Sequence, residues 1–327
     1  MKLLFALLVV SAAAAQTGTF APDRMETVLY GVAYYPEYMP YDRVDKDVAM
    51  MQKAGITVVR VGESTWSSWE PRDGDFQFAW MERVIDKMQQ AGIKVILGTP
   101  TYTIPTWLYK AHPEILVTHN GTAPPLRNPY YPTYPPSLPP GYYGPRQNMD
   151  FLNPDYRRYA ERVIRQVVGH FHKHPAVIGY QIDNETFPNG VPTPYTERAF
   201  LDRLKHKYET TDVLNRIWGL AYWGQLVDRW EDLPPRDGIL NPGYKLEWEN
   251  FQHDIVTEFL AWQAKIVNEY KRPDQFITQD FSGGVHTNLD QWAIRQIWIL
   301  WLRIRISRRK SSSMAALSGL RVIWEGH

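Results

Sequence analysis

The alternation of short apolar stretches with helical patterns is the feature that most constrains the fold. Apolar runs such as VVRVG at 58–62 and KVILGT at 94–99 lie on either side of amphipathic segments, and Gly55 and Gly92 stand where those helices would end. Apolar strands separated by single helices are typical of βαβ units, whose strands are buried on both faces. We therefore expect an α/β fold with a parallel sheet.

The same pattern predicts the bounds of the main elements. We expect strands at 30–35, 58–62, 94–99, 176–182 and 275–280, and helices at 42–54, 78–91, 154–172 and 244–271. Residues 122–145 are dense in Pro, Tyr and Gly, which excludes a helix and favours a long loop over one face of the sheet. Residues 194–271 read as a mostly helical insert after the fourth strand.

Composition limits the class of protein. The chain is 44% hydrophobic and 22% charged with a net charge of +1, which is ordinary for a soluble globular protein and favours neither nucleic acid nor a membrane as partner. It contains no cysteine, so disulfides and thiolate metal sites are excluded. Aromatic residues make up 14% of the chain, and exposed aromatic rings stack well on sugars. A carbohydrate ligand is the first expectation.

The N-terminus has the features of a secretory signal. Lys2 supplies a positive charge, residues 3–10 are apolar, and Ala13 to Ala15 offer a cleavage site of small residues. The apolar stretch is too short to span a bilayer stably. We therefore expect residues 1–15 to be a signal peptide and the mature protein to be secreted or periplasmic.

The last 33 residues, 295–327, differ in composition from the rest. They contain seven of the 36 basic residues but only one of the 35 acidic ones, Glu325. No clear helical or strand period is visible in them. We interpret 295–327 as an anomalous basic tail, produced by a change of reading frame near Ile294; a genuine basic C-terminal segment is the alternative. The domain assignment is then 1–15 signal peptide, 16–294 partial barrel domain and 295–327 tail.

Polar residues follow several of the predicted strands directly. Tyr35 follows the first strand, Arg60 and Glu63 mark the end of the second, and Asn184 and Glu185 end the fourth. Carboxyl ends of parallel strands meet at one edge, so these side chains should converge. Burial there raises the pKa of a carboxylic acid, which suits a general acid near neutral pH. The simpler alternatives are helix caps and ion pairs, such as Glu63 with Arg60.

Other notable residues have structural interpretations. Asp183 alternates in side with Asn184, so we expect it to brace the barrel rather than to contact substrate. Trp66 and Trp69 are candidates for the core. The three histidines at 170, 172 and 174 are spaced so that a helix end scatters them, and we interpret them as charges that complement the helix C-terminus, not as metal ligands.

Seven ordered motifs together resemble glycoside hydrolase family 42, the β-galactosidases. They are GVAYYPEYMP, VRVGESTWSSWEP, ILGTPTYTIPTWL, HPEIL, GPRQNMDFLNPDYRRYA, IGYQIDNE and IWGLAYWGQL, and the resemblance covers about residues 28–294. It implies a (β/α)8 TIM barrel and a retaining mechanism with two glutamates. It also implies a β-galactoside as the small-molecule substrate and, for the full-length form, a homotrimer.

The resemblance assigns roles to four residues. Glu185 is implied as the general acid/base and Asn184 as the residue that binds the sugar beside it. Arg146 of the G-x-R motif is implied to contact substrate, and Trp223 of the AYW segment to form a subsite wall. Two further residues are implied as supporting members of the rim, Glu63 and Tyr35.

Two departures from the family qualify these expectations. Many members carry a four-cysteine zinc site, but Asp150 stands at one ligand position and the later cysteines are absent, so we expect no metal and no cofactor. The family's nucleophile lies well over a hundred residues past the acid/base, and nothing around Glu325 resembles its motif. We therefore expect an incomplete barrel, with about five of eight strands, that lacks the nucleophile and has doubtful activity.

Three functional hypotheses follow. The first is a secreted β-galactosidase that removes terminal β-D-galactosyl residues. The second is another retaining barrel glycosidase, such as a β-glucosidase or arabinosidase. The third is a catalytically inactive fragment that binds galactosides through Arg146, Asn184 and Trp223.

Overall fold

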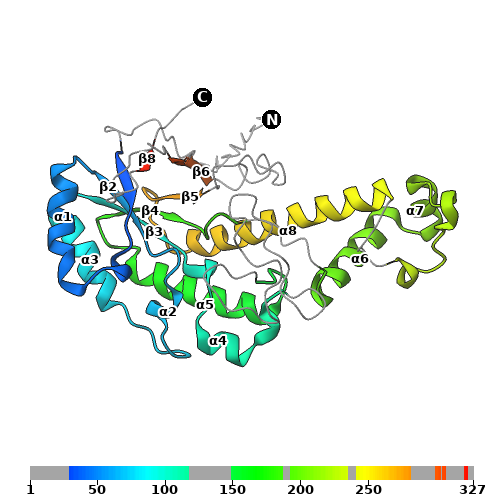
Figure 1. Cartoon of the computed structure of the whole chain (residues 1–327), viewed down its shortest axis with the longest axis horizontal. Helices are drawn as coiled ribbons and strands as arrows, with labels where there is room; N and C mark the ends of the chain where they lie inside the picture. Colours follow the sequence, from blue (N-terminus) through cyan, green and yellow to red (C-terminus); the bar gives the residue numbers. More distant parts are fainter. Residues whose placement is uncertain are drawn as a thin grey trace, which may run out of the picture.

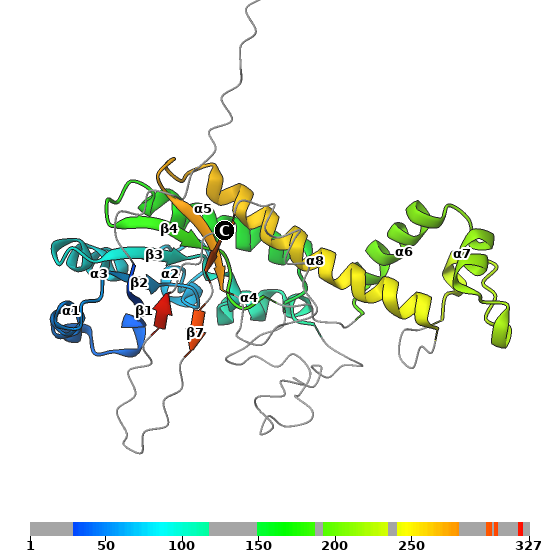
Figure 2. The same cartoon turned by 90° about the horizontal axis from the view of Figure 1, so that it is seen from above.

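The computed structural model describes residues 29–117, 149–186, 192–234 and 241–280, and the backbone alone of 299–302, 304–306 and 320–322. Strands and helices alternate along the first part of the chain, and a helical arm extends from one side of the sheet (Figures 1 and 2). Two expectations fall outside these residues: the signal peptide at 1–15 and the loop at 122–145.

The centre of the molecule is a parallel sheet of six strands. Their spatial order is their order in the sequence, and each strand runs parallel to its neighbours. The strands are β1 (Gly31–Ala33), β2 (Val58–Val61), β3 (Lys94–Gly98), β4 (Val177–Gln181), β5 (Phe276–Asp280) and β6 (Ile299–Leu302). The strictly sequential parallel order is that of a (β/α)8 barrel, of which the described strands form an incomplete part. The expected fold class is confirmed.

Helices connect the strands and cover one face of the sheet. The helices are α1 (Val44–Lys53), α2 (Trp66–Trp69), α3 (Ala79–Gln90), α4 (Thr106–Ala111), α5 (Pro154–Phe171), α6 (Pro194–Tyr208), α7 (Thr211–Trp218) and α8 (Pro242–Asn268). The large apolar core lies between sheet and helices, and the expected core residues Trp66 and Trp69 are fully buried in it. A second, small cluster on other strand positions joins Val58, Ile96 and Phe276.

Local sequence signals set the ends of the helices. Asn153 caps α5, since its side chain accepts hydrogen bonds from the backbone N–H groups of Asp155 and Tyr156, and Pro154 takes the first helical position, where no N–H is needed. Gly55 and Gly92 follow α1 and α3 with φ of 73°, the left-handed conformation that glycine adopts without strain. The helices and strands predicted up to residue 280 are therefore confirmed, with bounds shifted by at most three residues.

The insert after β4 forms the helical arm, which we define as residues 192–234 together with the first half of α8. In both views α6 and α7 lie well away from the strands, and α8 runs from the arm back to the sheet (Figures 1 and 2). Glu247 of α8 holds α6, because it accepts a hydrogen bond from the Tyr208 hydroxyl at 2.9 Å and pairs with Lys207. No helix within the described ranges is long and apolar enough to cross a bilayer.

One further strand of the sheet lies in the C-terminal segment. The sequence shows no clear period in 295–327, yet β6 lies there, followed by an antiparallel pair, β7 (Ile304–Ile306) and β8 (Leu320–Val322). The sheet accordingly has six strands where about five were expected. ILWL at 299–302 is a short continuous apolar run, and such a run is compatible with a strand although it shows no alternation. That 295–327 is an anomalous tail stays a prediction.

Candidate active site

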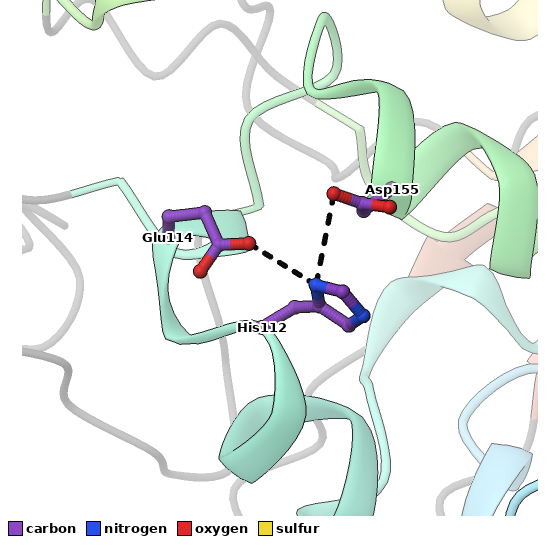
Figure 3. A group of neighbouring side chains, drawn as sticks. All are labelled: His112, Glu114 and Asp155. Carbon is purple, nitrogen blue, oxygen red and sulfur yellow. Dashed lines mark hydrogen bonds and ion pairs between the residues drawn. The ribbon is translucent and has the colours of Figure 1, made fainter.

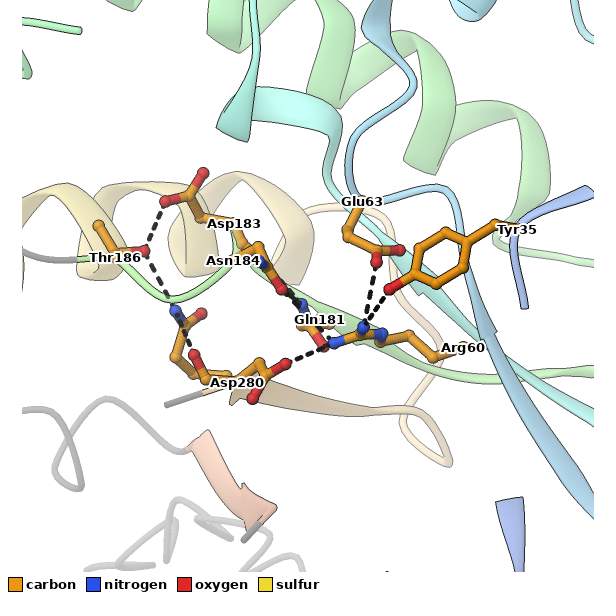
Figure 4. Close-up of polar contacts among 9 residues, drawn as sticks. Tyr35, Arg60, Glu63, Gln181, Asp183, Asn184, Thr186 and Asp280 are labelled. Carbon is orange, nitrogen blue, oxygen red and sulfur yellow. Dashed lines mark hydrogen bonds and ion pairs between the residues drawn. The ribbon is translucent and has the colours of Figure 1, made fainter. Parts of the chain in front are cut away.

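Arg60 is the centre of a polar cluster at the carboxyl ends of the strands (Figure 4). Its Nη1 donates hydrogen bonds to Asp280 Oδ2 at 2.6 Å and to Gln181 Oε1 at 3.0 Å, and lies 3.5 Å from Asn184 Oδ1. Its Nη2 donates to the Tyr35 hydroxyl at 3.1 Å and lies 3.0 Å from Glu63 Oε1. One guanidinium thus joins residues that follow β1, β2, β4 and β5.

The fold places Arg60 and Glu63 through strand alternation and one glycine. Arg60 lies in β2 two residues after Val58, so both lie on the opposite side of the strand from Val59 and Val61, which pack in the large core. Glu63 sits directly against β3 at Gly98: a Cβ on Gly98 would lie 2.6 Å from the Glu63 Cα. The close approach therefore requires glycine. The predicted pairing of Glu63 with Arg60 is confirmed.

The charges of this cluster compensate one another in a dry environment. Arg60, Glu63 and Asp280 are 7%, 2% and 8% exposed. Burial lowers the pKa of Arg60, but Glu63 and Asp280 more than offset this and raise it above its usual value, so the guanidinium stays charged. Burial raises the pKa of Asp280, and Arg60 opposes that rise. Removing the one cation would leave two buried carboxylates without compensation.

Asn184 and Glu185 lie next to this cluster, in a turn with unusual backbone conformation. Asp183 and Glu185 have φ of 50° and 46°, in the left-handed region that side chains other than Gly, Asn and Asp rarely adopt. The Glu185 N–H donates to the Asp280 carbonyl at 3.0 Å, and Gln181 Nε2 donates to Asn184 Oδ1 at 3.2 Å. Backbone strain of this kind is concentrated at functional sites. The turn is therefore held, by neighbouring strands, in a form it would not adopt alone.

Asp183 lies on the other side of the turn and is enclosed by hydroxyl groups. Its carboxylate accepts hydrogen bonds from Thr101 Oγ1 at 2.8 Å and from Thr186 Oγ1, and the side chain is almost fully buried. Burial raises the pKa of Asp183 to about 6, although both threonine hydroxyls act to lower it. The placement agrees with the expectation that Asp183 braces the barrel.

Glu37 is a second carboxyl group at this edge with a raised pKa. It lies in a single 3₁₀ turn after β1, Pro36–Tyr38. Burial raises the pKa of Glu37 to about 7 and the nearby Glu63 adds to the rise, while the residue's own backbone N–H lowers it. The Glu37 Oε2 atom is buried and has no hydrogen-bond partner among the described residues. The carboxyl ends of the strands thus include a partly buried carboxyl group whose pKa is raised toward neutral.

The structure brings together two of the four predicted site residues. Asn184, 8% exposed, and the half-buried Glu185 lie at the carboxyl ends of the strands. Arg146 lies outside the described residues. Trp223 lies on the helical arm, where it is 79% exposed, and in both views the arm is remote from the strand ends of its own chain (Figures 1 and 2). The roles of all four stay predictions.

Three side chains form a separate group with the donor types of a metal site, His112, Glu114 and Asp155 (Figure 3). His112 Nδ1 lies 3.1 Å from Glu114 Oε1 and 3.6 Å from Asp155 Oδ2, and Asp155 also accepts a hydrogen bond from Arg158 at 3.0 Å. These contacts describe an ion-pair network between the end of α4 and the start of α5. Exposed ion pairs of this kind are common without a metal.

The residues discussed for metals in the sequence are engaged elsewhere. His170 contacts Glu82 at 2.6 Å, His174 contacts Asp86 at 3.1 Å, and His172 contacts the Gly169 carbonyl, so the three imidazoles face different partners. Asp150, at the family's zinc-ligand position, accepts a hydrogen bond from Thr193 Oγ1. That contact ties the start of α5 to the cap of α6.

The arrangement of the site defines a class of protein. A parallel barrel-type sheet carries, at the carboxyl ends of its strands, a buried arginine, several carboxyl groups and an Asn-Glu pair in a strained turn, which are the groups expected of an enzyme site in such a fold. A sequence profile of glycoside hydrolase family 42, described as β-galactosidase, matches residues 33–300. The chain belongs to this family.

Similar proteins extend this finding. A curated β-galactosidase of Thermus sp. is 33% identical over 275 residues, and one of Haloferax lucentense is 31% identical over 278 residues. The crystal structure of a β-galactosidase from Rahnella sp. R3 superposes with a TM-score of 0.75 at 28% identity, over 86% of this chain and 40% of that one. The matches with the two curated proteins cover 82% and 83% of this chain but only 40% and 39% of theirs. The chain thus spans about two fifths of the length of these relatives.

Some site residues were not found from the sequence. Asp280, Gln181 and Gln263 all belong to the buried polar network, with Gln263 of α8 accepting a hydrogen bond from Thr99 at 2.7 Å. The place of Asp280 in the site could have been predicted, because this residue ends a buried strand just as the Asn-Glu pair does. The place of Gln263 in the site could not have been predicted, since a polar residue in a long helix is usually interpreted as facing solvent.

Proposed function

We propose that this chain carries the acid/base half of a retaining β-galactosidase site and that its substrates are terminal β-D-galactosides. The observation that carries the proposal is the Asn184–Glu185 turn, held at the carboxyl end of β4 beside the Arg60 cluster. Membership of family 42 and the similarity to named β-galactosidases support galactose as the sugar.

The proposed roles follow from the chemistry of each group. A half-buried carboxylic acid at Glu185 would donate its proton to the leaving-group oxygen and take one back from water in the second step. Asn184, whose Oδ1 lies near Gln181 and Arg60, keeps its amide N–H₂ to donate to a sugar hydroxyl. The buried cation of Arg60 would hold this amide in place.

A retaining mechanism needs a second carboxyl group about 5 Å from the first. Asp280 and Glu63 are nearby carboxylates, but both are engaged by Arg60. We propose that the nucleophile is missing from this chain, and that Asp280 and Glu63 keep the arginine in position. The 327-residue chain by itself should then show little or no turnover.

Hydrolysis of nitrophenyl glycosides tests this proposal, with the purified chain and its Glu185→Gln variant compared on galactoside, glucoside and arabinoside. Galactose binding measured by calorimetry, with little turnover, is the expected result. Strong Glu185-dependent turnover would mean that the nucleophile lies within the chain. Preference for glucoside or arabinoside would favour another retaining glycosidase. Absence of binding to all three sugars would contradict a sugar site.

Two further parts of the proposal concern the protein's destination and assembly. We propose that residues 1–15 direct export and are removed, which mass spectrometry of the mature N-terminus checks directly. We also propose that the arm contacts another copy of the chain. The support is a group of exposed apolar side chains on the arm, Ile217, Tyr222, Trp223 and Leu226. In such an assembly Trp223 could reach a site that it does not reach within its own chain.

A further inference from the structure

We propose that Asp183 is a positioning residue: its carboxylate, enclosed by Thr101 and Thr186, holds the strained turn that carries Asn184 and Glu185. The role of that turn rests on the proposed function. The claim that Asp183 holds the turn does not rest on the proposed function, because it concerns contacts within this chain. We call the three residues the Asp183 clasp.

The clasp connects three neighbouring strands. Thr101 follows β3, Asp183 and Thr186 follow β4, and Gln279 of β5 donates from Nε2 to Thr186 Oγ1 at 3.1 Å. The carboxylate therefore links the ends of β3 and β4 directly and reaches β5 through one hydroxyl. Figure 4 shows Asp183, Thr186 and the side chain between Thr186 and Asp280 in this sequence of contacts.

Backbone contacts bind the same turn from both sides. The Asp183 N–H donates to Thr99 Oγ1 at 2.7 Å, and its carbonyl accepts from Gln181 Nε2 at 2.9 Å. Two residues later, the Glu185 N–H donates to the Asp280 carbonyl. Since φ is positive at both Asp183 and Glu185, these bonds must offset the conformational cost of holding both residues in the left-handed region. The clasp adds side-chain bonds to that balance.

A carboxylate suits this position better than other small polar groups. Both partners are hydroxyls that can donate, and an ionised carboxylate accepts from both without donating anything. Burial of this charge without a cation has an electrostatic cost, which appears as the raised pKa of Asp183. Among the described residues no cation pairs with this charge, so its burial does not favour folding, which points to a geometric role.

Three substitutions at Asp183 distinguish two explanations. Either its side-chain hydrogen bonds hold the turn, or the residue matters only because it tolerates a positive φ. Asn keeps the shape and one acceptor and tolerates positive φ; Gly tolerates positive φ best but has no side chain; Ala has neither property. If only strain matters, Asp183→Gly should hold the turn at least as well as Asp183→Asn. If the clasp matters, Asn should hold it and Gly should fail together with Ala.

Hydrogen–deuterium exchange of the 327-residue chain measures this directly. We expect amides 183–186 to exchange about tenfold faster or more in the Gly and Ala variants than in wild type, and the Asn variant, which keeps one of the two acceptors, to lie between them and wild type. The matched control is Asp150→Asn, a buried aspartate that also accepts from a threonine, Thr193. It should leave exchange at 183–186 unchanged. Wild-type exchange in Asp183→Gly would overturn the proposal.

A second measurement separates this proposal from the proposed function. Saturating galactose should slow exchange at 183–186 in wild type and in Asp183→Asn, and should not do so in Asp183→Gly. If galactose protects no variant while the exchange pattern without sugar holds, the sugar site is wrong and the clasp stands. If Asp183→Gly is protected as fully as wild type, the clasp does not position the turn for sugar.

Discussion

The rim of the sheet, by which we mean the carboxyl ends of its strands, buries its charged side chains, whereas the helical arm exposes charged and apolar side chains to solvent. At the rim, Arg60, Glu63 and Asp280 are buried and compensated by one another. On the arm, pairs such as Arg229 with Asp232 are largely exposed, and Trp223 is 79% exposed. Buried, compensated charges suit chemistry in a dry site, whereas exposed apolar surface suits contact with another protein. The two regions thus differ in what they bury and what they expose, although one chain forms both.

The largest effect should come from removing the central cation of the rim. Arg60→Met leaves Glu63 and Asp280 buried without compensation, and should lower the free energy of unfolding by about 3–5 kcal/mol in urea titrations. Arg229→Met on the arm is the matched control and should leave unfolding close to wild type, because water replaces the lost partner. Equal effects of the two changes would remove the contrast between rim and arm.

A smaller effect should appear as a pH dependence of the free energy of unfolding, caused by Glu37 at the rim. The pKa of Glu37 is raised to about 7, so between its ordinary value and 7 the folded protein binds a proton that the unfolded chain has lost. The stabilisation that the protonated Glu37 contributes is complete at pH values below its ordinary pKa and is lost as the pH rises through 7. Glu37→Gln, which cannot ionise, should therefore match wild type at pH 4.5 and exceed its stability by about 1 kcal/mol at pH 8.

Thermal unfolding at the two pH values checks this second expectation. The control is Glu114→Gln, which changes a half-exposed carboxylate outside the Arg60 cluster and should give parallel curves for variant and wild type. A Glu37→Gln variant that is no more stable than wild type at pH 8 would show that the folded protein does not raise this pKa.

The smallest effect on stability should come from the arm. Trp223→Ala removes a side chain that is already exposed, so unfolding should not change, but self-association measured by sedimentation should weaken about tenfold or more. Tyr38→Ala is the control, because Tyr38 is 77% exposed but lies beside β1. If both variants associate like wild type, the exposed surface of the arm does not hold copies together.

The sequence predicted the elements that follow strong local signals. Glycines after α1 and α3, the Asn153-Pro154 start of α5 and the apolar strands gave the order of the fold up to β5. The Asn184-Glu185 pair was found because a strand end carries it. The contacts of Arg60 with Asp280 and of Gln263 with Thr99 could not be predicted, since they join positions 220 and 164 residues apart and depend on the register of the sheet.

The remaining failures have separate physical causes. The strand β6 was missed because a four-residue apolar run has no period to detect. The placement of Trp223 could not be derived from a motif, because a motif gives the identity of a residue but not the direction in which an inserted arm extends. The strained turn at Asp183 could not be predicted from the sequence either. Asp tolerates positive φ but occurs at negative φ as well, so its presence does not indicate the conformation.

The 27-residue helix α8 joins the two regions. Near its start Glu247 holds α6, and near its end Gln263 accepts hydrogen bonds from Thr99 and Thr101, the residues that also contact Asp183. About 24 Å of continuous helix separates these two attachment points. A single helix therefore connects the packing of the arm with the residues that contact Asp183, so that one end of α8 belongs to the outer surface and the other to the surroundings of the Asn184–Glu185 turn.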